Sequence, residues 1–130
     1  MPLIRIDVVE GRRTPERLRL LADSVHEALV EKFAAPEADR LQIIHEHRPE
    51  HMILRDVGLG FERTEDVVVL QITQQGRGAA QKEALYARIA ELFEQRGIAK
   101  SQDLVICLIE NTRADWSLGY GRAQFLQGDL

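Results

Sequence analysis

Pro2 is the residue whose type and position most directly suggest chemistry. Removal of Met1 would leave a secondary amine at the start of the chain, and an α-amino group titrates at roughly 7.7–8.0, far below lysine. Such an amine can transfer a proton or attack a carbonyl near neutral pH. The apolar run Leu3–Val9 follows at once and predicts a strand, which would hold the amine in place. Proline is also tolerated as a first strand residue for structural reasons alone, so the dipeptide does not decide the function.

Arginine and aspartate side chains offer further chemistry, although each has a plainer structural interpretation. Arg77 stands where a later strand would end, and in isolation it would be a solvated residue at a helix start, as we expect for Arg12. Asp39 follows Pro36 closely and could simply cap a turn. Their residue types fit carboxylate binding and proton transfer, but spacing alone does not assign them.

The histidines do not predict a metal site. His45 and His47 alternate on a predicted strand and therefore share a face, with His51 nearby. No acidic or cysteine ligand stands at a spacing typical of zinc, so we expect no metal. His26 lies off the main apolar stripe of the first predicted helix. It could reach the site as an auxiliary contact to a carboxylate, but we expect it at the surface or in an interface.

Composition bounds the class of protein. A length of 130 residues predicts a single domain over 1–130, and 45% hydrophobic with 29% charged residues is typical of a soluble globular protein. The net charge of -4 and the scattered basic residues give no case for binding nucleic acid or a membrane surface. Without a membrane span or signal-peptide core, we expect the cytoplasm. The single cysteine, Cys107, excludes an internal disulfide, and its apolar surroundings predict a small buried side chain.

The chain repeats one strand–helix–strand pattern, in units of about 2–47 and 66–111. The dipeptide Gly76-Arg77 repeats Gly11-Arg12, and a final segment, 112–130, mixes glycines with apolar residues. The expected elements are strands over 3–9 and 41–46 around a helix that Thr14 and Pro15 begin and Pro36 ends, then strands over 67–73 and 104–109 around a helix that Gly97 ends.

Two such units predict an α/β (α+β) fold. Right-handed crossovers make the strands within each unit parallel, and together the units form a four-stranded mixed sheet with both helices on one face. The opposite sheet face would stay bare in a single chain. We therefore expect these faces to meet in an oligomer, with the apolar segment 112–130 folded over an edge or onto a neighbour.

The Met-Pro start, the tandem repeat and the Gly-Arg after the third strand together resemble the tautomerase superfamily, whose members use an amino-terminal proline. The longer, fused members usually assemble as trimers. Within the superfamily the chain resembles malonate semialdehyde decarboxylases along nearly its whole length. The segments that carry this resemblance are Met1-Pro2-Leu3, Glu10-Gly11-Arg12, Ala35-Pro36, Asp39-Arg40, His47-Arg48-Pro49, Gly58-Leu59-Gly60, Glu110-Asn111, Ala114-Asp115-Trp116-Ser117, Phe125-Leu126 and Gly128-Asp129-Leu130.

The resemblance implies roles for individual residues. Pro2 takes the place of the catalytic proline, Asp39 that of the active-site aspartate, and Arg77 that of the second of two carboxylate-binding arginines. Gln75 stands where the family has the first arginine; a glutamine can hydrogen-bond a carboxylate but brings no charge. The hydrophobic wall of the family's site falls on Trp116, Leu118, Phe125 and Leu130, with Leu118 in place of the usual Phe.

The implied reaction is decarboxylation of malonate semialdehyde, a 3-oxo acid, to acetaldehyde and carbon dioxide. A cationic Pro2 would take up the developing charge, by a hydrogen bond to the carbonyl oxygen or as an iminium ion. Arg77 would hold the carboxylate, the apolar wall would exclude water, and Asp39 would favour the protonated amine. The chemistry requires no metal or organic cofactor, and the family resemblance implies a homotrimer.

Two other functions stay open. The same site could serve a keto–enol tautomerase with a neutral proline as base, or a hydratase or dehalogenase of short unsaturated acids in which Asp39 activates water. The chain could also be a non-enzymatic oligomeric binding protein in which Pro2 is incidental. Retention of Met1 would favour this last function, because every catalytic scheme needs the free amine.

Overall fold

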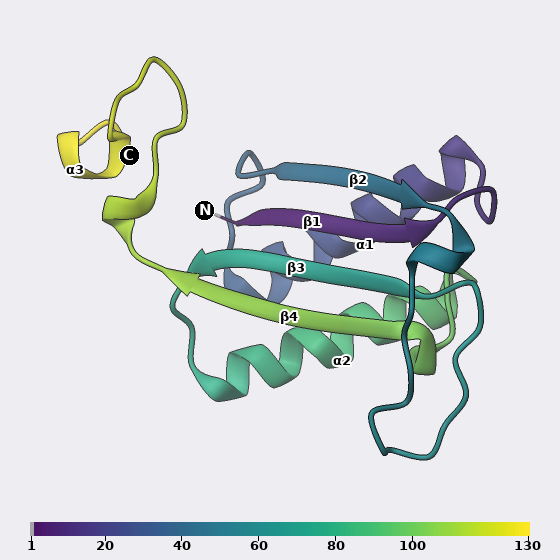
Figure 1. Ribbon diagram of the computed structural model, residues 1–130. Coiled ribbons are helices and arrows are strands. Elements are labelled where there is room, and N and C mark those ends of the chain that lie inside the picture. Colours follow the sequence, from purple (N-terminus) through teal and green to yellow (C-terminus); the bar gives the residue numbers. More distant parts are fainter. Residues whose placement is uncertain (1) are drawn as a thin grey trace.

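The structure is a computed structural model that describes residues 2–130, so the expected removal of Met1 concerns a residue outside the described part. It contains one four-stranded sheet in the order β2-β1-β3-β4. The central pair β1 and β3 is antiparallel, whereas β1 with β2 and β3 with β4 are parallel. Both long helices cover the same sheet face (Figure 1), which confirms the predicted fold. The bounds are β1 (Leu3–Val9), α1 (Pro15–Phe33), β2 (Leu41–His47), β3 (Val68–Gln75), α2 (Ala79–Gln95) and β4 (Leu104–Asn111).

The helix starts follow the predicted local chemistry. Thr14 caps α1, its side-chain oxygen accepting a hydrogen bond from the Arg17 backbone N–H at 3.2 Å, and proline opens the first turn. The end of α1 was predicted at Pro36 but comes earlier, after Phe33, because Ala34 adopts a left-handed conformation with φ 52°. Gly97, at φ 63°, follows the end of α2 as predicted.

The core lies between the sheet and the two helices. Even-numbered residues of β1 and β3 face the helices and are completely or almost completely buried. Apolar residues at helical spacing on α1 and α2 complete this layer. Its largest fully buried apolar side chains are Ile4, Ile6, Leu21, Leu29, Leu70, Ile72, Leu85, Ile89, Leu92, Phe33 and Phe93.

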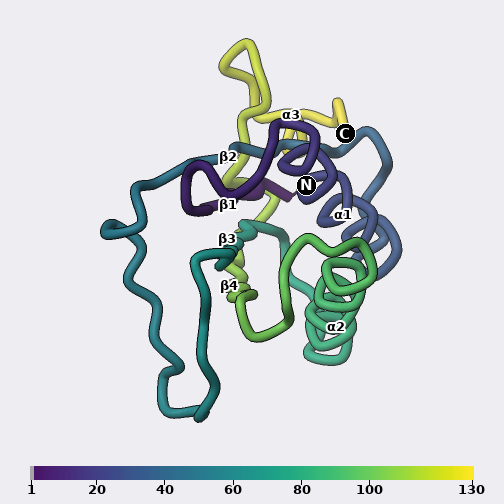
Figure 2. Tube along the Cα trace, turned by 90° about the vertical axis from the view of Figure 1, so that its right-hand side faces the viewer, coloured from purple at the N-terminus to yellow at the C-terminus, as the bar shows by residue number. Residues whose placement is uncertain are grey.

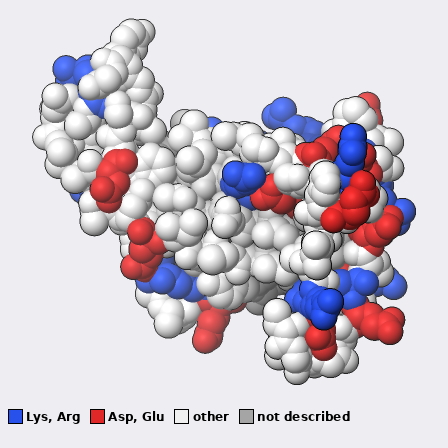
Figure 3. All heavy atoms as spheres, in the orientation of Figure 1, with Lys and Arg blue, Asp and Glu red and all other residues white. Residues whose placement is uncertain are grey.

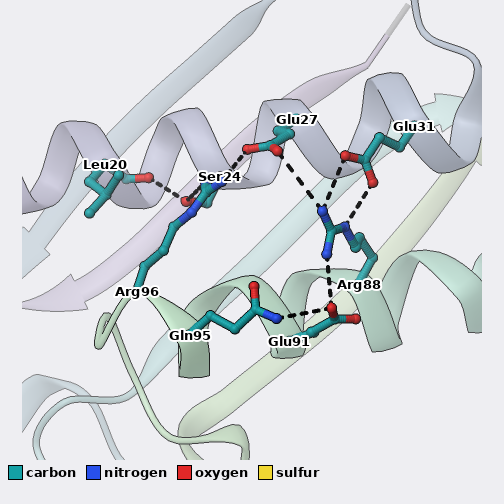
Figure 4. A network of polar contacts seen from close by, with 8 residues as sticks. All are labelled: Leu20, Ser24, Glu27, Glu31, Arg88, Glu91, Gln95 and Arg96. Carbon is teal, nitrogen blue, oxygen red and sulfur yellow. Dashed lines mark hydrogen bonds and ion pairs between the residues drawn. The ribbon is translucent and has the colours of Figure 1, made fainter.

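A polar network joins the two helices across their outer surface (Figure 4). Arg88 of α2 contacts Glu31 at 2.7 Å and Glu27 at 3.9 Å, both on α1. Arg96, just after α2, donates to Glu27 at 2.7 Å and to the Ser24 hydroxyl at 2.8 Å. Because these arginines are only 22% and 31% exposed, the network supports the packing of α1 on α2 better than fully solvated ion pairs would.

The other sheet face is covered by no helix of the described chain. Figure 3 views the molecule from this side, where uncharged atoms cover most of the sheet. Cys107 lies on this face and is exposed, so the prediction of a buried cysteine is wrong for the single chain. The reason is strand alternation: the odd-numbered residues of β4 point away from the helices.

The C-terminal segment leaves the end of β4 and forms an arm. It contains the short helices η3 (Arg113–Asp115) and α3 (Gln124–Gln127). Figures 1 and 2 show that the arm projects beyond the sheet instead of folding back over it. Within residues 2–130, no helix is both long and apolar enough to cross a membrane.

Candidate active site

One end of the sheet gathers most of the residues singled out in the sequence. The register pairs Leu3 with Thr73 across β1 and β3, and Gln75 with Asn111 across β3 and β4. Strands β1 and β2 therefore begin where β3 and β4 end (Figure 1). Pro2, which precedes β1 directly and is buried, lies at this end.

Asp39 reaches the same end from the turn before β2. Its backbone N–H donates to the Pro36 carbonyl at 2.9 Å, and the residue is half-buried. Among residues 2–130 its carboxylate has no hydrogen-bond or ion-pair partner. The neighbouring Arg40, by contrast, donates to Asp23 at 2.6 Å and to Gln42 at 2.7 Å. Asp39 thus brings a carboxylate without a partner among the described residues to this turn.

His26 fixes the turn that carries Asp39. Only 5% of the residue is exposed, and its Nε2 lies 3.0 Å from the Glu37 carbonyl oxygen, to which it can only donate. The predicted surface or interface position for His26 is therefore wrong, because the chain after α1 folds back over it. Its spacing from Ala22 and Leu29, both buried on α1, was the signal that would have placed it inside.

Arg77 is held firmly by backbone carbonyls. Its Nε and Nη2 donate to the Phe33 carbonyl at 3.2 and 3.1 Å, and its Nη1 donates to the Gln75 carbonyl at 2.8 Å. The guanidinium carbon also lies 5.3 Å from the centre of the Phe33 ring. Arg77 therefore closes the C-terminal end of α1. Nη1 also donates to the Gly76 carbonyl at 3.4 Å. These contacts use at most four of the five N–H groups of the guanidinium, so at least one remains for a ligand.

Two adjacent glutamines at the end of β3 have unused amide groups. Gln75 has a buried Nε2 without a hydrogen-bond partner among the described residues. Gln74 is 2% exposed, and neither its Oε1 nor its Nε2 has a partner there. The sequence interpretation missed Gln74, although its strand parity, shared with buried Leu70 and Ile72, indicated an inward-facing polar side chain.

The predicted hydrophobic wall is divided within one chain. Trp116 is buried against the sheet end, where its indole N–H donates to Asn111 Oδ1 at 3.0 Å. Leu118 is half-buried. Phe125 belongs to α3 and Leu130 ends the chain, and Figure 1 shows both α3 and the C-terminus well apart from the start of β1. A single chain therefore does not bring the whole wall to Pro2.

His45 and His47 lie on the open sheet face, away from this end of the sheet. His47 Nε2 lies 2.6 Å from Asp7 Oδ1 on the open sheet face, and the His45 and His47 rings stack 6.3 Å apart. Within residues 2–130, no group of three or more His, Cys, Asp or Glu is arranged to hold a metal.

Comparison with known proteins identifies the family. A family model described as a tautomerase enzyme matches residues 39–119, and a second with the same description matches residues 2–62. The chain belongs to the tautomerase family. The "Probable tautomerase YrdN" of Bacillus subtilis (strain 168) is 46% identical to this tautomerase-family chain over 130 residues, covering 100% of both. The "Probable tautomerase YusQ" of the same strain is 31% identical over 98% of this chain and 100% of its own.

Solved structures of malonate semialdehyde decarboxylases resemble this tautomerase-family enzyme closely. One, described for its decarboxylase and hydratase activities, is 39% identical with a TM-score of 0.94 over 98% of each chain. Another, FG41 malonate semialdehyde decarboxylase inhibited by 3-bromopropiolate, is 43% identical with a TM-score of 0.93, over 98% of this chain and 97% of its own. A fused 4-OT described as an asymmetric trimer is 24% identical with a TM-score of 0.74, over 96% of this chain and 98% of its own, and shares the fold.

Proposed function

We propose that this tautomerase-family enzyme is a cofactor-independent decarboxylase that converts malonate semialdehyde into acetaldehyde and carbon dioxide. The observation that supports this most is the strand register, in which β1 and β2 begin and β3 ends at one end of the sheet, so that Pro2, Asp39 and Arg77 all stand near that end. It occurs in a chain 39% and 43% identical to two malonate semialdehyde decarboxylases. The proposal includes the removal of Met1, which makes the Pro2 nitrogen a free secondary amine.

The amine of Pro2 acts as the cation of the site. When the bond between the carboxylate carbon and the methylene carbon breaks, its electron pair moves toward the aldehyde carbonyl. The protonated proline stabilises the resulting enolate by a hydrogen bond to its oxygen. In the alternative route the neutral amine first condenses with the aldehyde and loses water, the iminium ion so formed takes up the electrons as an enamine, and water later releases the product. Protonation of the methylene carbon then yields acetaldehyde, so one proton is consumed and carbon dioxide leaves uncharged.

Arg77 and Gln75 hold the carboxylate. The contacts of Arg77 to the Phe33 and Gln75 carbonyls fix its guanidinium before substrate arrives, which reduces the entropy lost on binding. The buried Nε2 of Gln75 can donate a second hydrogen bond, replacing the family's first arginine without its charge. Holding the carboxylate out of the carbonyl plane aligns the breaking bond with the π system.

Asp39 keeps the amine protonated. A carboxylate within a few ångströms of an ammonium favours the charged form of that amine. The Asp39 carboxylate is not occupied by another residue of the described chain, whereas Arg40 beside it is taken up by Asp23.

The full site is formed in a homotrimer. The arm that carries Phe125 and Leu130 projects away from its own sheet, so it supplies the hydrophobic wall to an adjacent subunit. Contact between subunits also covers the open sheet face, with its exposed Leu41, Ile43 and Ile109.

A hydratase activity is the second candidate. The relative described for both decarboxylase and hydratase activities supports it, since Asp39 could also activate water beside a cationic proline. A keto–enol tautomerase, in keeping with the curated B. subtilis relatives, would instead use neutral Pro2 as a base. The pH dependence separates these candidates: decarboxylation falls as the amine deprotonates, whereas tautomerisation rises.

The decisive experiment combines intact mass with an assay on malonate semialdehyde. Active protein should lack Met1, and Pro2→Ala, which keeps only a primary amine, should lose most activity. A variant that retains Met1 should be inactive. Full activity in protein shown by mass spectrometry to carry Met1 would exclude the proposed chemistry.

A further inference from the structure

Gln74 is a buried amide whose hydrogen-bonding groups are not used by the part of the chain that the structure describes. Only 2% of the residue is exposed, and both its Oε1 and Nε2 lack a partner among residues 2–130. Buried polar groups in folded proteins are nearly always hydrogen-bonded, because leaving one unpaired is costly. Such an amide therefore indicates a partner that the folded, described chain does not provide.

The strand register sets Gln74 beside the proline. Leu3 of β1 lies opposite Thr73 of antiparallel β3, so one residue further along, Pro2 is next to Gln74. Both residues continue the even-numbered sides of their strands, which face the helices and are buried. In Figure 1 the start of β1 and the end of β3 lie together at the same sheet end.

We propose that Gln74 is a positioning residue for the amine of Pro2, with its amide oxygen accepting a hydrogen bond from the protonated secondary amine. This inference rests on the proposed function, in which removal of Met1 frees that amine. A protonated proline nitrogen has two N–H groups. With one held by Gln74, the other is directed to the substrate carbonyl.

The bond has a consequence that can be measured. A hydrogen bond to the charged form of an amine stabilises that form and raises the pKa of the group. Gln74 thus helps to keep Pro2 cationic without adding a charge of its own. The charged residues of the elements that reach this sheet end include Glu37, Asp39 and Arg40 before β2, Arg77 after β3, Lys32 in the last turn of α1, Arg113 and Asp115 after β4, and Glu110 of β4 paired with Lys82 of α2 at 2.7 Å.

The test is a direct titration of the Pro2 nitrogen by NMR in the full chain labelled with [15N]proline. Gln74→Met keeps the shape of the side chain without its amide, and should lower the pKa of Pro2 by about one unit. Gln74→Glu places a carboxylate at the same point and should raise it. None of the charged residues named above changes in either variant, so the comparison isolates position 74.

Gln95→Met is the matched control, because Gln95 is exposed on α2 and bonds only to Glu91 among the described residues. It should leave the titration unchanged. A merely structural role for Gln74 would lower thermal stability in Gln74→Met and Gln74→Glu alike without moving the pKa of Pro2 in opposite directions. If Gln74→Met does not fold, Gln74→Asn, whose shorter amide withdraws from the amine, should give the same downward shift.

The outcomes separate this inference from the proposed function. Retention of Met1 on active protein would overturn both. Full decarboxylase activity in Pro2→Ala would overturn the proposed role of the Pro2 amine in catalysis. A free Pro2 amine that titrates identically in wild type, Gln74→Met and Gln74→Glu would overturn only the assignment of Gln74.

Discussion

At the scale of single residues, Arg77 combines a structural contact with a proposed substrate contact. Arg77→Ala should reduce decarboxylation by roughly 30- to several-thousand-fold, because losing the one charged partner of a desolvated carboxylate commonly costs ~2–5 kcal/mol. The variant also loses the hydrogen bonds to the Phe33 and Gln75 carbonyls, at a cost of about 1–3 kcal/mol of unfolding free energy. Steady-state kinetics, measured well below the melting temperature of the variant, separates the two effects.

Arg12 provides the control, since it occupies the equivalent Gly-Arg position in the first unit. Its guanidinium is exposed and pairs with Asp66 at 2.8 Å on the surface. Surface ion pairs contribute little to folding stability, so Arg12→Ala should change both activity and stability very little. Equal losses of activity in both variants would show that the Gly-Arg dipeptide is structural.

Apart from Pro2, the sequence could assign the candidate site residues only through family resemblance. It did not show that Arg77 closes the end of α1, because that contact joins residues far apart in the chain. It also placed His26 wrongly and missed Gln74. Both are polar residues at buried positions, and their burial depends on tertiary packing that a periodicity of apolar residues does not report.

At the scale of elements, strands, helices and their order were predictable because their signals are local. Thr14 and Pro15 begin α1 as the sequence indicates, and alternation or continuous apolar runs marked the strands. The end of α1 was not predictable in this way, because Ala34 adopts the left-handed conformation that ends the helix, where glycine is the usual residue.

Ala34 therefore offers a simple stability test. A left-handed conformation costs a non-glycine residue roughly 1–2 kcal/mol, whereas glycine adopts it freely but loses more entropy on folding. Ala34→Gly should raise the unfolding free energy by about 0.5–1 kcal/mol, seen as a higher melting temperature. A lower melting temperature would mean that the Ala34 methyl group makes a packing contact that outweighs the strain.

The β1–β2 pair carries a pH-dependent contact. Burial raises the pKa of Asp7, but hydrogen bonds from His47 and Arg5 outweigh it and leave the pKa below the usual 3.8. A lowered carboxyl pKa stabilises the fold above the unfolded-state value, and this stabilisation is lost as pH falls through the folded-state pKa. We therefore expect the unfolding free energy of Asp7→Asn, measured with urea at fixed protein concentration, to fall less steeply than that of wild type as the pH drops below about 5. Parallel curves for the two proteins would contradict this account.

At the scale of the whole molecule, the open sheet face and the projecting arm both support the proposed trimer. Light scattering should give three times the 14.8 kDa chain mass. Trp116→Ala removes the contact to Asn111 at the base of the arm, so it should weaken both trimer stability and substrate binding. A fully active monomer at nanomolar concentration would refute a site that is shared between subunits.

The network between the two helices makes the halves of the chain complementary to each other. α1 supplies the glutamates Glu27 and Glu31, whereas Arg88 and Arg96 come from the second half. Two copies of the first half would bring glutamate against glutamate, and two copies of the second would lack the α1 glutamates that pair with Arg88 and Arg96. A chain cut in the loop between β2 and β3 should therefore reassemble as a one-to-one heterodimer of unlike fragments. The charges of the network therefore favour the pairing of unlike halves.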